Sequence, residues 1–128
     1  MSIYSTGRFE LTIITDCIFR MKPAEGIDMD IRDVLEMRKK YLEFSGNKPF
    51  AVLLDATGSF TVQEDARALL ASKQFTEKRK AAALVTPGLA NRIVGNFFIR
   101  FNKPATPTKL FNDEVSALLW LKEQMKDQ

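Results

Sequence analysis

A strand that ends at an aspartate, with a glycine and two hydroxyl groups close behind it, is the stretch of this sequence best equipped for chemistry. It reads LLDATGSFTVQEDARALLAS and covers residues 53–72. Asp55 closes an apolar strand, and Gly58 permits a turn with positive φ. Ser59 and Thr61 place hydroxyl groups beside the start of a helix, where a phosphate group would meet a favourable helix dipole. These two residues are therefore the candidate phosphoacceptors.

The same stretch also has a purely structural interpretation. Thr61 and Glu64 have the T-x-x-E spacing of a capping box at the start of a helix. Ser59 would then be a turn residue. The residues by themselves favour this structural interpretation, and a site for a phosphate, a ligand or a partner protein is the alternative.

A second candidate surface lies on a predicted helix at 87–101, which contains the run NRIVGNFFIRFNK. Gly95 is in the middle of this helix, where glycine costs about 1 kcal/mol relative to alanine and often marks a close approach. The polar side of the helix, opposite its phenylalanines, carries Arg92, Asn96, Arg100 and Lys103. One interpretation is a binding face with a groove beside Gly95. The other is an amphipathic helix whose glycine lets it pack closely on the sheet.

Several kinds of chemistry lack the residues that they need. The sequence has no histidine, which excludes Ser-His-Asp and Cys-His catalysis and the commonest zinc sites. Cys17 is the only cysteine, has no base partner in the sequence and is expected to be a packing residue. The carboxylates of DMDIRD suit a negatively charged helix start better than a metal loop. We therefore expect a non-enzymatic protein with no catalytic, cofactor or metal site.

Composition predicts one globular domain that covers residues 1–128. The chain is 45% apolar and 27% charged, which is enough for a single hydrophobic core. Its net charge is +3, but its basic runs are short and lie at expected helix or strand ends, so no nucleic-acid partner is expected. No apolar run approaches the ~18–20 residues of a membrane helix. The lone cysteine and the absence of a signal-like start favour the cytoplasm.

Hydrophobic periodicity and turn residues predict alternating strands and helices. The expected elements are an antiparallel hairpin at 7–14 and 17–22, helices at 30–44, from 61, at 87–101 and at 113–126, and strands at 50–55, 80–85 and 108–111. Asp30, Thr86 and either Asn112 or Asp113 are predicted helix N-caps. The order β-β-α-β-α-β-α-β-α implies an α/β domain with a mostly parallel five-stranded sheet and helices packed against it.

This element order, with VLLDATGSFTVQEDARALL at its centre, resembles the STAS-like domains typified by the SpoIIAA anti-anti-sigma factor. In those domains a strand ends in an aspartate, a hydroxyl residue and a glycine follow, and a helix begins near a phosphorylatable serine. Asp55, Thr57 and Gly58 match the first part of that pattern. The resemblance implies a SpoIIAA-like fold and a regulatory, protein-binding role.

The phosphoacceptor part of the family pattern is not matched. Its serine position falls on Glu64, or on Gln63 if one gap is allowed, and neither side chain accepts a phosphate. Ser59 and Thr61 are the remaining hydroxyls, at slightly different positions. The resemblance therefore does not carry over the switching of the family by a partner kinase.

The C-terminal run VGNFFIRFNKPATPTKLFNDEVSALLWL, residues 94–121, is similar to small bacterial proteins described as STAS/SEC14-like, most of them uncharacterised. Two functions follow as expectations. The first is a cytoplasmic, homodimeric interaction module whose partner is a protein. The alternative is a carrier of a small apolar or lipid-like ligand, in which the ten phenylalanines and Gly95 frame a cavity.

The expected partner surface combines the loop at 56–64 with the helices that follow residues 60 and 86. Its candidate residues are Asp55, Thr57, Gly58, Ser59, Thr61, Arg92, Gly95, Asn96 and Arg100.

Overall fold

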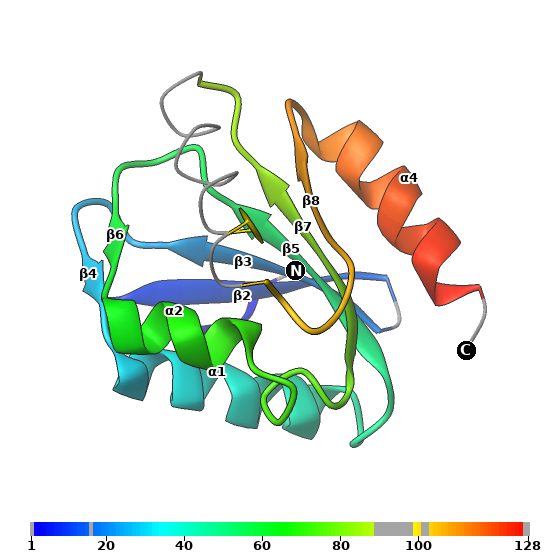
Figure 1. Ribbon diagram of the computed structural model, residues 1–128, viewed down its shortest axis with the longest axis horizontal. Coiled ribbons are helices and arrows are strands. Elements are labelled where there is room, and N and C mark those ends of the chain that lie inside the picture. Colours follow the sequence, from blue (N-terminus) through cyan, green and yellow to red (C-terminus); the bar gives the residue numbers. More distant parts are fainter. Residues whose placement is uncertain (1, 16, 89–98, 101–102, 127–128) are drawn as a thin grey trace.

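A six-stranded sheet forms the centre of the protein in a computed structural model (Figure 1). The structure describes residues 2–15, 17–88, 99–100 and 103–126. The strand order is β1-β2-β3-β5-β7-β8. The strands are β1 (Ser2–Ser5), β2 (Phe9–Thr15), β3 (Ile18–Pro23), β5 (Phe50–Asp55), β7 (Arg79–Val85) and β8 (Thr108–Phe111). The pairs β1–β2 and β2–β3 are antiparallel, and β3, β5, β7 and β8 run parallel. The predicted hairpin and mostly parallel sheet are confirmed.

Two features of the sheet were not predicted. The strand β1 adds a sixth member by pairing with β2, with Ser2 opposite Thr12 and Ser5 opposite Glu10. A separate two-stranded parallel sheet joins β4 (Asp28–Met29) to β6 (Thr61–Val62). These strands are two to four residues long, so they carry too few residues for a periodic pattern to show in the sequence.

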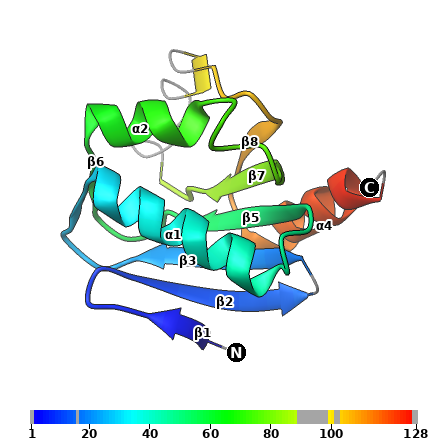
Figure 2. The same cartoon turned by 90° about the horizontal axis from the view of Figure 1, so that it is seen from below.

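Three helices are described, α1 (Ile31–Phe44), α2 (Glu64–Ala71) and α4 (Glu114–Met125). The helices α1 and α2 lie together over one face of the sheet (Figure 2). The helix α4 covers β5, β7 and β8 from the other face. Of the predicted helix at 87–101, residues 99–100 are helical, and 89–98 and 101 lie outside the described residues. No described helix is long and apolar enough to cross a bilayer.

Large side chains fill the core between the sheet and the α1/α2 layer. Phe19, Tyr41 and Phe50 come from β3, α1 and β5, and their ring centroids are 5.2–5.9 Å apart. Aromatic rings at these separations stabilise a core beyond the area that they bury. The neighbouring residues of this core include Leu11, Met21, Val34, Met37 and Val52.

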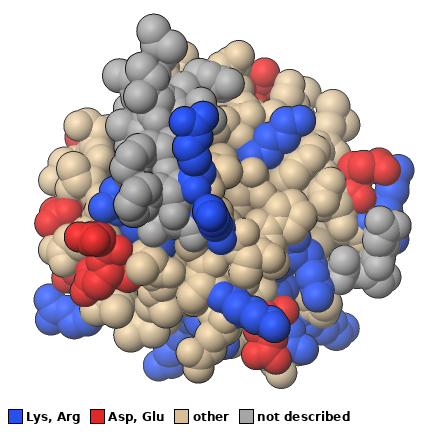
Figure 3. Space-filling model, in the orientation of Figure 1, with Lys and Arg blue, Asp and Glu red and all other residues tan. Residues whose placement is uncertain are grey.

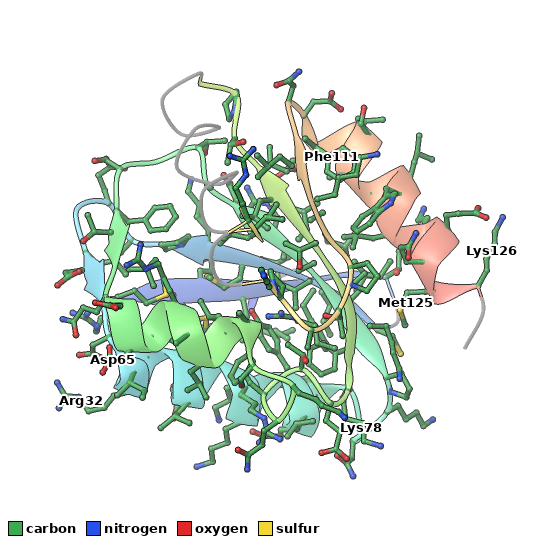
Figure 4. The ribbon with its side chains drawn as sticks, viewed as in Figure 1. Arg32, Asp65, Lys78, Phe111, Met125 and Lys126 are labelled. Atoms are coloured by element: carbon green, nitrogen blue, oxygen red, sulfur yellow. The ribbon has the colours of Figure 1, made fainter. Side chains whose placement is uncertain are left out.

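Small side chains fill the opposite core, beneath α4. Ala51 on β5 and Ala81 and Ala83 on β7 are fully buried, as are Ala117 and Leu121 of α4. Alanine has only a methyl group, so the helix axis can approach the strands closely there. At the edge of this layer the ring of Phe111 on β8 packs 5.5 Å from that of Trp120 (Figure 4).

Two of the predicted helix caps are confirmed. Asp30 accepts hydrogen bonds from the backbone N–H groups of Arg32 and Asp33, and the Asp33 carboxylate accepts one from Asp30 N–H. Asp113 accepts a hydrogen bond from Ser116 N–H at the start of α4. The Thr86 N–H donates to Phe111 O. Pro87 and Gly88 were expected to begin the helix that Thr86 caps, but neither is helical, and residues 89–98 lie outside the described residues.

The predicted capping box of Thr61 and Glu64 is wrong. The N-cap of α2 is Gln63, and its side chain makes no capping hydrogen bond. Thr61 lies in β6, where its N–H donates to Ile27 O and its hydroxyl donates to Asp28. The Thr61 hydroxyl, which the capping box would have used, is therefore bonded to β4, a strand more than thirty residues earlier in the chain.

Close packing beneath α4 can be tested with Ala83→Leu. The three added carbons have no space against α4, so we expect the free energy of unfolding to fall by about 1–3 kcal/mol in urea denaturation. Val115→Ala is the matched control, because Val115 lies on the same helix but is 71% exposed. It should change stability by no more than about 0.5 kcal/mol. Equal effects of the two variants would contradict the packing described here.

Candidate functional site

Asp55 lies at the carboxyl end of β5, the edge at which open α/β sheets place their sites. Only 3% of the residue is exposed. One carboxylate oxygen accepts hydrogen bonds from the Thr57 N–H at 3.0 Å and the Thr57 hydroxyl at 2.5 Å. The other pairs with the Arg20 guanidinium. Both oxygens of Asp55 are therefore already engaged inside the protein.

Arg20 joins this carboxylate to a second one. It projects from β3, and its Nε donates to the carboxylate of Glu114 at 2.6 Å. Glu114 is the first residue of α4. We call Asp55, Arg20 and Glu114 the Arg20 bridge, because one guanidinium ties together β3, β5 and α4.

The electrostatics of the bridge favour the ionised form of Asp55. Burial would raise the pKa of the Asp55 carboxyl group, but hydrogen bonds from Thr57 and the charges of Arg20 and Lys22 outweigh burial. The pKa is therefore held below its ordinary value. Asp55 remains a carboxylate at neutral pH, poorly suited to act as a general acid.

The segment that follows Asp55 is fixed by contacts with the loop at 24–29. Ser59 N–H donates to the Glu25 carboxylate at 3.0 Å, and Gly26 N–H donates to Ser59 O at 2.6 Å. A Cβ on Gly58 would lie 2.8 Å from Glu25 Oε2, so glycine permits this approach. Farther along, Thr61 N–H and Gln63 N–H donate to the carbonyls of Ile27 and Met29.

Asp28 completes the attachment. Its carboxylate accepts hydrogen bonds from the Thr61 hydroxyl at 2.7 Å and from the Gln63 side-chain amide at 3.0 Å. These bonds, with that of Thr61 the larger, hold the pKa of Asp28 below its ordinary value. The segment 57–65 is thus held along its length while most of its side chains remain exposed. We call it the rim segment.

The two candidate phosphoacceptors lie in acidic surroundings. The Thr61 hydroxyl already donates to Asp28, so a phosphate there would meet a carboxylate. Ser59 is exposed, and its backbone N–H is bonded to Glu25. Like charges disfavour a phosphate at either position.

The other predicted site residues divide into two groups. Asp55, Thr57, Gly58, Ser59 and Thr61 are brought together at the carboxyl edge of the sheet. Arg92, Gly95 and Asn96 lie outside the described residues, and Arg100 is exposed in the helical pair 99–100. Asp55 is buried, so it contributes to this edge by positioning Thr57.

Sequence reasoning missed Arg20, Glu25 and Asp28, the side chains that hold this edge in place. Arg20 alternates along its strand with Phe19 and Met21, which both enter the α1/α2 core. That alternation indicates an arginine on the α4 face of a buried strand, where it needs an acidic partner. The contacts of Glu25 and Asp28 span more than thirty residues and leave no comparable signal.

A buried cation lies at the opposite end of the parallel strands. Arg79 begins β7, and its guanidinium donates to Leu70 O at 2.9 Å in the last turn of α2. It also lies 5.7 Å from the centre of the Phe75 ring. Burial lowers the pKa of Arg79 to about 10, with a smaller opposing effect of Tyr41. The negative end of the α2 dipole compensates the charge, so we assign Arg79 a structural role.

The Arg20 bridge can be tested with Asp55→Asn. The change leaves Arg20 without its buried partner charge, so we expect the free energy of unfolding at pH 7 to fall by about 1.5–3 kcal/mol. Glu114→Gln alters the more exposed arm of the bridge and should cost about 0–1 kcal/mol. Urea denaturation of both variants measures these values. A larger loss for Glu114→Gln would contradict the assigned order of importance.

The same bridge predicts how stability depends on pH. The pKa of Asp55 is lower in the folded state than in the unfolded chain, so its stabilisation is complete above the unfolded value, near pH 4. That stabilisation is lost as the pH falls further, through the folded value. We expect the stability difference between the protein and Asp55→Asn to shrink when urea denaturation is repeated from pH 6 down to pH 3. A difference that is constant over this range would show that Asp55 is not the titrating group.

Comparison with known proteins supports the fold and leaves function open. An uncharacterised protein of the DUF3478 family from Shewanella loihica PV-4, which has a SpoIIAA-like fold, is similar with a TM-score of 0.65 and 17% identity. The match covers 93% of this chain and 98% of that one. A protein of unknown function from Arthrobacter sp. FB24 is 27% identical over 88% of this chain and 97% of that one, with a TM-score of 0.33.

No curated protein matches this chain. The resemblance to SpoIIAA-like domains that the sequence indicated is confirmed at the level of the fold. The model of a family described as "Domain of unknown function (DUF7793)" matches residues 12–125. The chain therefore has a SpoIIAA-like fold and belongs to the DUF7793 family.

Proposed function

We propose that this chain is a non-enzymatic regulatory module that binds a protein partner through the rim segment. The observation that supports this proposal is the combination of a fixed backbone and exposed side chains over residues 57–65. Thr57, Ser59 and Thr61 are exposed there, although hydrogen bonds to Asp55, Glu25 and Asp28 hold the chain beneath them.

A segment that is already ordered suits recognition. Binding requires the ordering of loops and side chains at the interface, and each mobile group that must be immobilised weakens the complex. The rim segment has its backbone held by β6 and by the contacts with Glu25 and Asp28 before any partner arrives. The ordered backbone of the rim segment therefore favours a role as an interaction surface rather than as a mere loop between β5 and α2.

The charge of this surface suggests the chemistry of the partner. Exposed carboxylates surround the rim segment at Glu25, Asp28, Glu64 and Asp65. Acidic atoms gather at the edge of the molecule where α2 begins (Figure 3), and Asp65 points outward there (Figure 4). None of the four carboxylates forms an ion pair with a described residue. We therefore expect the partner to present lysine or arginine side chains.

The remaining parts of the proposal are a homodimeric state and a location in the cytoplasm. Arg100 is proposed as a further contact, since it is exposed near the C-terminal end of the helix expected at 87–101. This cation would meet an acidic group of the partner.

The double variant Glu64→Lys/Asp65→Lys tests the proposed surface. We expect it to lose the partner that the unchanged protein captures from a lysate of its own organism, with the affinity reduced about tenfold or more. Binding of the unchanged protein should also weaken between 50 and 500 mM salt, because exposed charges are screened. Capture followed by quantitative mass spectrometry measures both effects.

Glu123→Lys is the matched control, since Glu123 is an exposed acid at the far end of α4. It should retain the partner. Thermal unfolding of each variant verifies that the fold is intact. A set of captured proteins that is the same for all three chains would refute the rim segment as the interaction surface.

A further inference from the structure

We infer that a cavity at the C-terminal end of α1 binds a small aromatic carboxylate. The cavity has a volume of about 330 Å³ and is lined by Ile13, Cys17, Phe19, Phe44, Ser45 and Lys48. Cys17 precedes β3 and Lys48 precedes β5, whereas Asp55 ends β5. The cavity thus lies at the opposite end of the parallel strands from the rim segment. We call it the α1 cavity, and it does not depend on the proposed function.

The lining of the α1 cavity is about equally polar and apolar, and its apolar side chains are partly uncovered. Ile13 and Phe44 are 37% and 39% exposed, so both present apolar surface to water at this site. Phe19 is buried behind them and belongs to the aromatic core with Tyr41 and Phe50. A ligand that covered Ile13 and Phe44 would remove apolar area from water, and Phe44 could pack against an aromatic ring.

The cavity is formed by irregular backbone on two sides. The pairing of β2 with β3 shifts register between Ile13 and Thr15, and Cys17 has a φ of 69°. On the other side Gly46 and Asn47 have φ values of 66° and 61° as the chain leaves α1. Register shifts of this kind often lie beside binding sites, where they redirect side chains.

The polar lining selects the charge of the ligand. Among the described residues of the lining, Lys48 is the charged one; it is exposed and forms no ion pair with a described residue. The Ser45 hydroxyl donates to Leu42 O, so it adds a neutral polar group. An ammonium group beside the apolar side chains of Ile13 and Phe44 favours a carboxylate joined to an apolar body. The volume is at the lower end for ligand pockets, which indicates one or two rings rather than a long chain.

The single cysteine allows occupancy to be measured directly. Cys17 lines the cavity and is the only thiol of the chain, so its rate of reaction with the neutral reagent 4,4′-dithiodipyridine reports on this site alone. We expect 2-naphthoate at saturation to slow that reaction about tenfold. The uncharged 2-naphthamide has the same shape but should protect much more weakly, because it cannot pair with Lys48.

Lys48→Gln tests the assigned charge contact, and Lys39→Gln is its matched control on the exposed side of α1. The concentration of 2-naphthoate needed for half-protection should rise about tenfold in Lys48→Gln and stay unchanged in Lys39→Gln. Thermal unfolding verifies that both variants fold. Absence of protection, equal protection by 2-naphthoate and 2-naphthamide, or equal behaviour of the two variants would overturn the proposal.

Discussion

The contact between the Arg20 guanidinium and the carboxylates of Asp55 and Glu114 is the constraint on which the working edge of the protein depends. A buried carboxylate is costly unless it is paired and hydrogen-bonded, and Asp55 meets both conditions. Because the same guanidinium also reaches Glu114, the start of α4 is set relative to the end of β5. The position of Thr57, and with it the path of the rim segment, follows from the orientation of Asp55.

The two faces of the sheet are packed by different means. Large aromatic and methionine side chains fill the side of α1 and α2, and alanines let α4 approach on the other side. Arg20 lies on the α4 face beside the first turn of that helix, and its side chain is 25% exposed, so the cation is partly solvated. The bridge therefore lies at the N-terminal end of the closely packed α4 layer.

Acidic side chains lie around the carboxyl edge of the sheet, so the segment after β5 has different surroundings from those that the family resemblance implied. In the resembling domains the segment after the strand leads to a phosphorylated serine. Here the same segment is hydrogen-bonded to Glu25 and Asp28, and the hydroxyl of Thr61 makes one of these bonds. A regulatory module built this way would recognise its partner through fixed carboxylates. The α1 cavity lies at the other end of the strands, so the two proposed surfaces do not overlap.

Much of the fold could be predicted from the residues, because local patterns determine it. Alternation indicated β2 and β3, a continuous apolar run indicated β5, and Asp30 and Asp113 marked the starts of α1 and α4. The candidate site was predicted in part. Asp55 was recognised as the end of a strand at the working edge, but its burial and its partner were not.

What the sequence determined by itself is therefore the order of the elements, their main caps and the place of Asp55 at the carboxyl edge of the sheet. Only the tertiary structure decided that Thr61 pairs with β4 instead of capping α2, that Asp55 faces Arg20, and that Ile13, Phe44 and Lys48 surround one cavity. The physical reason is distance along the chain. Caps and periodicity act over three or four residues, whereas these contacts join segments about thirty residues apart or more, which only the folded sheet brings together.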